Sequence, residues 1–287
     1  MKTTIIKRPL PPVVQYMRIA LKKPKPPKDE LVCEERARVA RKNISINQQE
    51  LRGYRQQCGF QNTGYLPFTY PFLLAFPLQS ELFLSDAYPY AVMGLVHVRN
   101  IITQHKRIPV DATLNIDCTL IGPEKVYHGQ HMTFYTRVFM GEELVWECRT
   151  VLLRRGRKHP DIAKEESLDT LENPQRIVDW EVPALTGVRY ALLGKDINPI
   201  HLFGFTARAF GFKQPIAHGM WAKAKAMAPL ESHIKDKAAE VVVDFKLPMY
   251  LPGKAQLGYN VEADKIDFSL VDPEDGKPYL NGRVRFL

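Results

Sequence analysis

Hydrophobic, β-branched and aromatic residues are concentrated in short segments that polar turn segments separate, a pattern typical of β-strands. The first half of the 287-residue chain contains three such segments, at 110–120, 133–139 and 144–153. The second half contains four, at 240–245, 255–263, 266–271 and 281–286. Turns with glycine, at 140–142 and 272–277, join strands within each half. The pattern therefore predicts two strand-rich regions.

The two regions belong to halves with a similar order of elements. In each half a helix-forming segment leads through a loop and a Pro-x-Ala turn into an apolar helix, and strands follow. The turn is Pro89-Tyr-Ala in the first half and Pro215-Ile-Ala in the second. We interpret this order as a duplicated α+β unit, with the first unit at 44–155, a linker at 156–178 and the second unit at 179–287.

Residues 1–43 differ in composition from the rest of the chain. The first 28 residues contain eight Lys and Arg side chains and no acidic one, so they carry most of the net charge of +9. Proline and clustered like charges oppose packing, so we expect an extended basic arm, which could steer a polyanionic partner. Residues 29–42 are acidic first and basic last, which complements a helix dipole and predicts a short surface helix.

The overall composition, 45% hydrophobic and 25% charged, is that of an ordinary globular protein. The most apolar stretch, 66–78, is too short to span a bilayer and contains three prolines. The N-terminus lacks the apolar core of a secretory signal, so we expect a cytoplasmic protein. The four cysteines are widely spaced, and His128 and His131 have no acidic or Cys companion. We therefore expect free thiols and no metal site.

One segment of the second half, Asp196-Ile-Asn-Pro-Ile-His201, carries a pattern typical of acid/base chemistry. Asn198 is a favourable N-cap residue, and Pro199 is favourable at the first helical position. We therefore predict a helix from Pro199 to about Phe210, with His201 in its first turn and Asp196 just before it. An Asp and a His fixed in this way can hold and activate one water molecule.

A second segment, Pro215-Ile-Ala-His218-Gly219-Met220, predicts the start of another helix, which ends at about Ala228. The first N–H groups of a helix have no internal partner and lie at the positive end of its dipole. Gly219 lets a substrate carbonyl approach these groups, as in an oxyanion site. His218 either bonds to backbone at the helix start or contacts substrate. Together the two segments indicate addition or removal of water next to a carbonyl group.

Both segments, with two others, resemble the MaoC-like dehydratases, which include the (R)-specific, type 2 enoyl-CoA hydratases. The matching residues are Tyr190-Ala191, Asp196-Ile-Asn198-Pro199-Ile-His201, Pro215-Ile-Ala-His218-Gly219-Met220 and Phe245-Lys-Leu-Pro248. The resemblance is close over residues 180–250 and extends loosely to the C-terminus. It implies an α+β double hotdog fold, in which two curved antiparallel sheets are each wrapped around a long central helix.

The resemblance also implies a role for each catalytic residue. Asp196 and His201 would bind and activate the water, Asn198 would orient the pair, and the Gly219 N–H would bind the thioester oxygen. The implied reaction is the reversible hydration of a trans-2-enoyl thioester to a (3R)-hydroxyacyl thioester, which needs no metal or redox cofactor. The acyl group would be carried by CoA or by an acyl-carrier protein.

The first unit resembles the degenerate partner unit of double-hotdog relatives. A gapless alignment that sets Tyr54 opposite Tyr190 replaces the acid/base pair by aromatic residues. It places Phe60 opposite Asp196, Asn62 opposite Asn198 and Tyr65 opposite His201. We therefore expect one active site per chain.

The degenerate unit of such relatives gives room to the acyl chain. The apolar, proline-containing stretch 66–78 is the candidate wall here, with Phe72 and Phe76 as the residues that contact the chain. Tyr190 and His218 complete the expected set of substrate-binding residues.

Three other functions are compatible with parts of the sequence. A hotdog thioesterase would use a similar helix-end oxyanion site but would not require the Asp-x-Asn-Pro-x-His turn. A non-catalytic acyl-thioester-binding protein would be expected to lack Asp196 or His201, and both are present. Nucleic-acid binding through the arm would call for interleaved aromatic residues and a basic body, so we expect no nucleic-acid partner. The oligomeric state stays open, with a homodimer among the alternatives.

Overall fold

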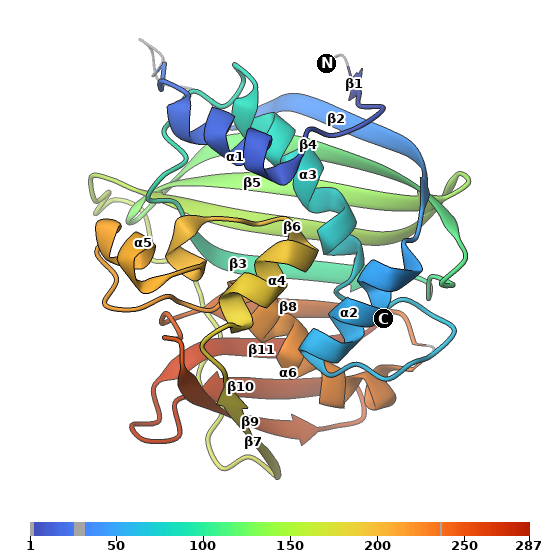
Figure 1. Ribbon diagram of the computed structural model, residues 1–287. Coiled ribbons are helices and arrows are strands. Elements are labelled where there is room, and N and C mark those ends of the chain that lie inside the picture. The colour runs from blue at the N-terminus through green and yellow to red at the C-terminus, as the bar shows by residue number, and fades with distance from the viewer. Residues whose placement is uncertain (1–2, 26–31, 236) are drawn as a thin grey trace.

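The computed structural model describes residues 3–25, 32–235 and 237–287, and Figure 1 shows one large sheet with helices packed in front of it. The strands are β1 (Thr3–Ile5), β2 (Glu34–Ser45), β3 (Val96–Gln104), β4 (Thr113–Val126), β5 (Gly129–Met140), β6 (Glu143–Arg155), β7 (Arg176–Val182), β8 (Ala239–Phe245), β9 (Gly253–Val261), β10 (Lys265–Val271) and β11 (Pro278–Phe286). The helices are α1 (Pro12–Leu21), α2 (Gln48–Cys58), α3 (Pro71–Leu84), α4 (Thr186–Gly194), α5 (Gly204–Ala209) and α6 (Gly219–Ile234), with a 3-10 turn η1 (Pro199–His201).

The sheet contains both units of the chain. All seven predicted strands are present, as β4–β6 and β8–β11. The strand order is β1-β2-β4-β5-β6-β3-β8-β11-β10-β9-β7, and β3 pairs antiparallel with β8. The two expected sheets are therefore continuous with each other. Across this junction, Nε of Arg99 lies 2.6 Å from the carboxylate of the buried Asp244.

Two long helices, α3 and α6, occupy the positions of the two central hotdog helices. In α3, 11 of 14 residues are buried, so its side chains are apolar on almost every face. The prediction of an apolar helix after Pro89-Tyr-Ala is wrong, because residues 89–95 form a loop. The central helix instead comes from the stretch 66–78, where Pro71 stands at the helix start and needs no N–H partner.

Two shorter helices lie over the boundary between the units. Helix α2 of the first unit contacts α4 and the central helix α6, whereas α4 of the second unit contacts α2 and the central helix α3. Each short helix therefore crosses to the central helix of the other unit. The rings of Tyr54 on α2 and Tyr190 on α4 are 6.3 Å apart at this crossing. The two units consequently share one hydrophobic core.

The N-terminal region departs from its prediction in two ways. The expected extended arm contains strand β1, which pairs in parallel with β2, and helix α1, which packs on α3. Pro11 and Pro12 permit this helix because they stand at its N-cap and first position. The surface helix predicted at 29–42 is wrong for residues 34–42, since these belong to β2 and pair with β4. Residues 26–31 of that region, including part of the Lys- and Pro-rich run, lie outside the described residues.

The segment between the units, from Gly156 to Gln175, contains no helix or strand. It lies against the second unit, where the Leu168 N–H donates to Asp244 over 2.6 Å and the Leu171 N–H donates to Ser269 over 2.8 Å. Of the helices described, none is long and apolar enough to cross a membrane.

Candidate active site

The predicted acid/base segment follows α4 and forms a tight turn. The Asn198 side chain accepts from the Ile200 N–H over 3.4 Å. The backbone N–H of Asn198 donates to the Asp196 carboxylate over 3.3 Å. Asn198 is therefore the N-cap, as predicted, and it also fixes the Asp196 side chain. The helix predicted from Pro199 to Phe210 is wrong in its length, because it is a 3-10 turn that ends at His201, and α5 is a separate short helix.

The backbone carbonyl of Ile216 fixes the proton position on His201. His201 Nδ1 lies 2.7 Å from this oxygen, which can only accept, so Nδ1 carries the proton. Burial, helped by the nearby His218, lowers the pKa of His201 to about 3, against the opposing effects of Asp196 and the Ile216 carbonyl. The ring is therefore neutral near pH 7, and its Nε2 is an unprotonated base.

His218 packs directly on His201, with ring centroids 3.7 Å apart. Its Nε2 donates to the Asp196 backbone carbonyl over 2.9 Å, and burial lowers the pKa of His218 to about 4. Within the described residues its Nδ1 is buried without a hydrogen-bond partner. His218 thus holds the Asp196 loop against the start of α6, the backbone role that the sequence offered as one alternative.

Asp196 is half-buried, and burial raises the pKa of its carboxyl group, against the effects of His201 and the Asn198 N–H. The adjacent Lys195 does not neutralise it, since the Lys195 ammonium lies 3.6 Å from Glu50 on α2. A carboxyl group with a raised pKa next to a neutral imidazole is suited to exchange of one proton.

Helix α6 begins directly beside this pair. His218 occupies the N-cap position and makes no side-chain capping bond, so the first N–H groups of the helix depend on other acceptors. Gly219 lines the same cavity as Asp196 and His201. A Cβ at position 219 would lie 2.9 Å from the Phe245 ring, so glycine allows α6 to begin against this side chain. The geometry is that of an anion- or carbonyl-binding helix start.

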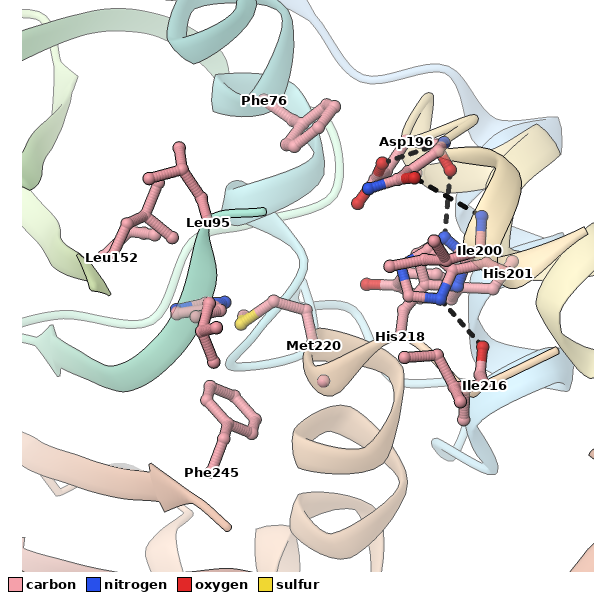
Figure 2. Close-up of a pocket in the computed structure, with 18 of the residues that line it drawn as sticks. Phe76, Leu95, Leu152, Asp196, Ile200, His201, Ile216, His218, Met220 and Phe245 are labelled. Atoms are coloured by element: carbon pink, nitrogen blue, oxygen red, sulfur yellow. Dashed lines mark hydrogen bonds between the residues drawn. The ribbon is translucent and has the colours of Figure 1, made fainter. Parts of the chain in front are cut away.

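The turn from Asp196 to His201, the His218 side chain and the start of α6 border a cavity of about 550 Å³. Figure 2 shows Asp196, His201 and His218 at one end, the apolar side chains Leu95 and Leu152 at the other, and Phe76 between them. The predicted wall residue Phe72 and the predicted contact Tyr190 also line the cavity. Burial raises the pKa of Tyr190, whose hydroxyl has no hydrogen-bond partner among the described residues. All eight predicted site residues therefore border one cavity.

Asp196, His201 and His218 are also the described residues whose geometry could hold a metal ion, since one ligand atom of each lies within 4.8 Å of the others. His201 Nδ1 and His218 Nε2 are occupied by hydrogen bonds to the carbonyls of Ile216 and Asp196. The atoms available as metal ligands are therefore His201 Nε2, His218 Nδ1 and the Asp196 carboxylate. One water molecule can also bridge the Asp196 carboxylate and His201 Nε2 with two hydrogen bonds.

The first unit repeats the frame of the site without its chemistry. Helices α2 and α4 both end at a residue with left-handed backbone, Gly59 and Lys195, and the buried Phe60 then takes the place of Asp196. Beyond this point the gapless alignment is wrong. Tyr65 forms a β-bridge with Pro109, as Ile216 does with Tyr250. Tyr65 is thus the counterpart of Ile216 rather than of His201, and the described residues between Gly59 and Tyr65 contain no counterpart of η1 or α5.

Two residues of the site were not predicted. Gly187 lies on α4 where a Cβ would be 1.9 Å from the His201 carbonyl oxygen. Glycine at this position therefore allows the turn from Asp196 to His201 to pack on the helix. A glycine inside a predicted helix was the available sequence signal. Tyr16 of α1 lines the cavity, and burial and then Asp196 raise its pKa to about 12. No local pattern could have placed an N-terminal helix beside a turn in the second unit.

Comparison with known proteins agrees with this fold and site. A profile of the MaoC like domain matches residues 170–248. The chain is 30% identical over 256 residues to 3-hydroxyacyl-thioester dehydratase X of Mycobacterium tuberculosis H37Rv, an alignment that covers 87% of this chain and 89% of the relative. A crystal structure of that protein, HtdX, superposes with a TM-score of 0.75 and 28% identity and covers 87% of this chain and all of its own.

A MaoC-like dehydratase from Phytophthora capsici has the same fold, with a TM-score of 0.71 and 18% identity over 87% of this chain and 95% of the other. The architecture is therefore the α+β double hotdog fold that was predicted. The chain belongs to the MaoC-like dehydratase family. It is accordingly a dehydratase, a hydro-lyase that acts in the hydration or dehydration direction.

Proposed function

We propose that the protein catalyses the reversible hydration of trans-2-enoyl thioesters to (3R)-hydroxyacyl thioesters. One observation carries the proposal: the Asp196 carboxyl group and the unprotonated Nε2 of His201 stand beside the start of α6, at one end of a largely apolar cavity. The name of the mycobacterial relative, a 3-hydroxyacyl-thioester dehydratase, supports a thioester substrate. The carrier is CoA or an acyl-carrier protein.

In the hydration direction, one water molecule lies between Asp196 and His201. Its oxygen attacks C3 while one of its protons passes to the pair. The electrons of the C2–C3 double bond shift towards the thioester oxygen, where the N–H at Gly219 stabilises the negative charge. C2 then takes a proton from the pair and the carbonyl re-forms. The net change is the addition of one hydrogen and one hydroxyl group, so the reaction consumes no redox equivalent and is proposed to need no metal.

The remaining site residues position these groups. Asn198 holds the Asp196 carboxylate through its N–H, and the Ile216 carbonyl keeps the proton of His201 on Nδ1. Tyr190 and His218 form the wall behind the pair, with their ring centroids 5.1 Å apart. They limit the space in which the C2–C3 bond can lie against the water.

The acyl chain would extend from this end of the cavity into the first unit. Phe72 and Phe76 of α3 line that part, with ring centroids 6.1 Å apart. An apolar chamber of this kind favours burial of a hydrocarbon chain over a charged one. The degenerate unit therefore sets the shape of the acyl site, whereas the second unit supplies the reaction.

The test is spectrophotometric. Crotonyl-CoA and longer trans-2-enoyl-CoAs are added to the full chain, and loss of the conjugated thioester absorbance is followed. Hydration is expected, with an (R)-configured product on chiral analysis, and the Asp196→Asn variant should lose about 10³-fold in kcat. Full activity of that variant, or no loss of absorbance at any chain length, would contradict the proposal.

A thiol reagent in the same assay separates the alternative of a thioesterase, which would release free CoA. The helix-end oxyanion site is shared by both reactions, but the Asp-His pair is not required for a thioesterase. We expect no thiol release above the uncatalysed rate.

A further inference from the structure

Helix α1 forms one wall of the substrate cavity, so its other face lies on the outside of the protein. Gln15, Tyr16 and Ile19 line the cavity. Gln15 is buried, and its amide donates to the Pro77 carbonyl over 3.2 Å and to the Glu81 carboxylate over 2.8 Å. A polar side chain therefore anchors the inner face of α1 to α3.

The outer face of α1 is apolar. Val13, Met17 and Leu21 follow one another at helical spacing and are 58%, 56% and 77% exposed, and Val14 is exposed beside them. A surface helix normally places its polar residues outside, whereas the exposed residues of α1 are mostly apolar, with Arg18 among them. A contiguous exposed apolar stripe indicates a contact surface.

Exposed basic side chains belong to the same N-terminal segment as this stripe. Within the described part of the N-terminal region, residues 3–25 contain no Asp or Glu. Lys7, Arg8, Arg18 and Lys23 are exposed. Lys22 instead turns inward and donates to three carbonyls at the end of α3. The surface combines apolar side chains with exposed positive charge, which complements an anionic lipid bilayer.

A second group of exposed apolar side chains lies around α5. Phe203, Phe205 and Phe210 are 47%, 73% and 43% exposed around α5, and Phe212, two residues later, lines the cavity. Both α1 and α5 lie in front of the sheet in Figure 1, at the left of the view. Exposed apolar groups therefore occur on α1, which lines the cavity, and around α5, which lies in the chain between the cavity-lining residues His201 and Phe212.

We propose that α1, with the aromatic residues around α5, docks this protein on an anionic lipid bilayer. Val13, Met17 and Leu21 enter the boundary between headgroups and acyl chains, and the basic side chains contact lipid phosphates. A bilayer is favoured over a second copy of the chain because two copies of this basic face repel each other. It is favoured over an acidic carrier protein because apolar side chains outnumber the one basic side chain, Arg18, on the exposed face of α1.

The docking would place a cavity wall directly on the bilayer. A hydrophobic acyl group held in the bilayer could then enter beside α1 without crossing water, which avoids the cost of exposing its apolar surface. This consequence for substrate delivery rests on the proposed function, whereas the docking does not.

The experiment is co-sedimentation of the full chain with vesicles of phosphatidylcholine mixed with phosphatidylglycerol, and with phosphatidylcholine alone. The wild type is expected to bind the anionic vesicles. The triple variant V13S/M17S/L21S should bind about tenfold or more weakly, because three apolar side chains no longer enter the bilayer. Ile177→Ser is the matched control, since Ile177 is 53% exposed on β7, at the far edge of the sheet from α1 (Figure 1), and its binding should equal that of the wild type.

A second variant, K7Q/R8Q/R18Q/K23Q, tests the charge. It should lose the preference for anionic over neutral vesicles, and the remaining binding should no longer weaken when salt is added. Equal binding by the wild type and both variants, or no binding of the wild type to anionic vesicles, would overturn the proposal. A dimer in light scattering that the triple variant dissociates, or acyl-carrier-protein binding without vesicle binding, would overturn it as well.

Two measurements separate this proposal from the proposed chemistry. The Asp196→Asn variant should bind vesicles as the wild type does, because Asp196 is not on the docking face. The triple variant should hydrate crotonyl-CoA in solution at the wild-type rate, since none of its three side chains lines the cavity. Vesicle binding without hydration would refute only the proposed function, and hydration without vesicle binding would refute only the docking.

Discussion

The two hotdog units end their short helices α2 and α4 alike, at a residue with left-handed backbone, but the chains that follow differ in length and content. In the first unit the path from Gly59 to Tyr65 is short, and Arg55 fills it. The Arg55 guanidinium donates to Asn62 over 2.5 Å and to the carbonyls of Thr63 and Tyr65 over 2.7 Å and 2.8 Å.

In the second unit the path from Lys195 to Ile216 is long enough to contain η1 and α5. The gapless alignment of the short helices sets Ala191 opposite Arg55 and Gly187 opposite the fully buried Leu51. The small residues Gly187 and Ala191 on α4 thus leave space for the turn from Asp196 to His201. The two units share the frame, and among the described residues the longer connection with Asp196 and His201 belongs to the second unit, where small residues on α4 admit it.

The largest expected effect comes from the acid/base pair itself. His201→Gln should lower kcat about 10³-fold, because the neutral amide cannot exchange a proton with water. Tyr65→Phe, at the position that the gapless alignment pairs with His201, should leave kcat unchanged. Steady-state kinetics with crotonyl-CoA measure both variants. A comparable loss in Tyr65→Phe would show that the first unit takes part in the reaction.

The next effect is expected at the contact between α4 and the catalytic turn. Gly187→Ala should lower kcat about 10²-fold, since a Cβ there would lie 1.9 Å from the His201 carbonyl oxygen and must displace the turn. Gly53→Ala on α2 is the matched control. Its Cβ would meet only the flexible Leu193 side chain at 3.0 Å. Equal activity of the two variants would show that the position of the turn does not depend on Gly187.

A smaller effect is expected from the two asparagines. Asn198→Ala should lower kcat about tenfold, because the side-chain N-cap of η1 is lost and the turn that positions Asp196 loosens, although the backbone N–H of residue 198 is kept. Asn62→Ala should leave kcat unchanged and lower Tm by a few degrees, because it removes only a bond to Arg55. Kinetics and thermal unfolding of both variants distinguish the roles. The reverse outcome, with kcat reduced in Asn62→Ala alone, would contradict this assignment.

The acyl chamber should show a more modest response. Phe76→Ala is expected to raise kcat/KM for longer or branched enoyl-CoAs relative to crotonyl-CoA by roughly threefold, because it enlarges the apolar end of the cavity. Phe139→Ala on β5 is a control that does not line the cavity. Unchanged chain-length selectivity in Phe76→Ala would remove α3 from the acyl site.

The smallest effect concerns the two central helices. Only α6 buries a lysine, Lys223, whose ammonium donates to the carbonyl and side chain of Asn100 and to the Val241 carbonyl. Burial lowers the pKa of Lys223 to about 7, from 10.5 in the unfolded chain. Between these values the unfolded state binds more protons, so the free energy of unfolding should rise with pH there.

Lys223→Met should abolish this rise, and urea unfolding at pH 7 and pH 10 measures it. Lys225→Met on the same helix is the control, since Lys225 lies over the Trp180 ring and is not fully buried. The proposal of a buried lysine with a lowered pKa fails if both variants show the same pH dependence as the wild type.

The local sequence pattern was sufficient for the elements whose residues carry their own instructions. The seven predicted strands are present because runs of β-branched and aromatic residues favour extended backbone wherever they are placed. The N-cap at Asn198 was predictable because capping depends on side chains only two or three residues apart. The resemblance to a known family predicted six of the eight candidate residues, the apolar stretch 66–78 supplied Phe72 and Phe76, and all eight border one cavity.

Only the tertiary structure decided the features that depend on distant partners. Residues 34–42 became a strand because β4 pairs with them, and the stretch 66–78 became a central helix because the sheet, α1 and α4 cover its faces. The proton on His201 is fixed by the Ile216 carbonyl, and its pKa by burial. The basic N-terminal region, which composition alone described as an arm, became a wall of the cavity because Gln15 reaches α3. A local pattern can state what a segment prefers, but these contacts join residues that are far apart in the chain.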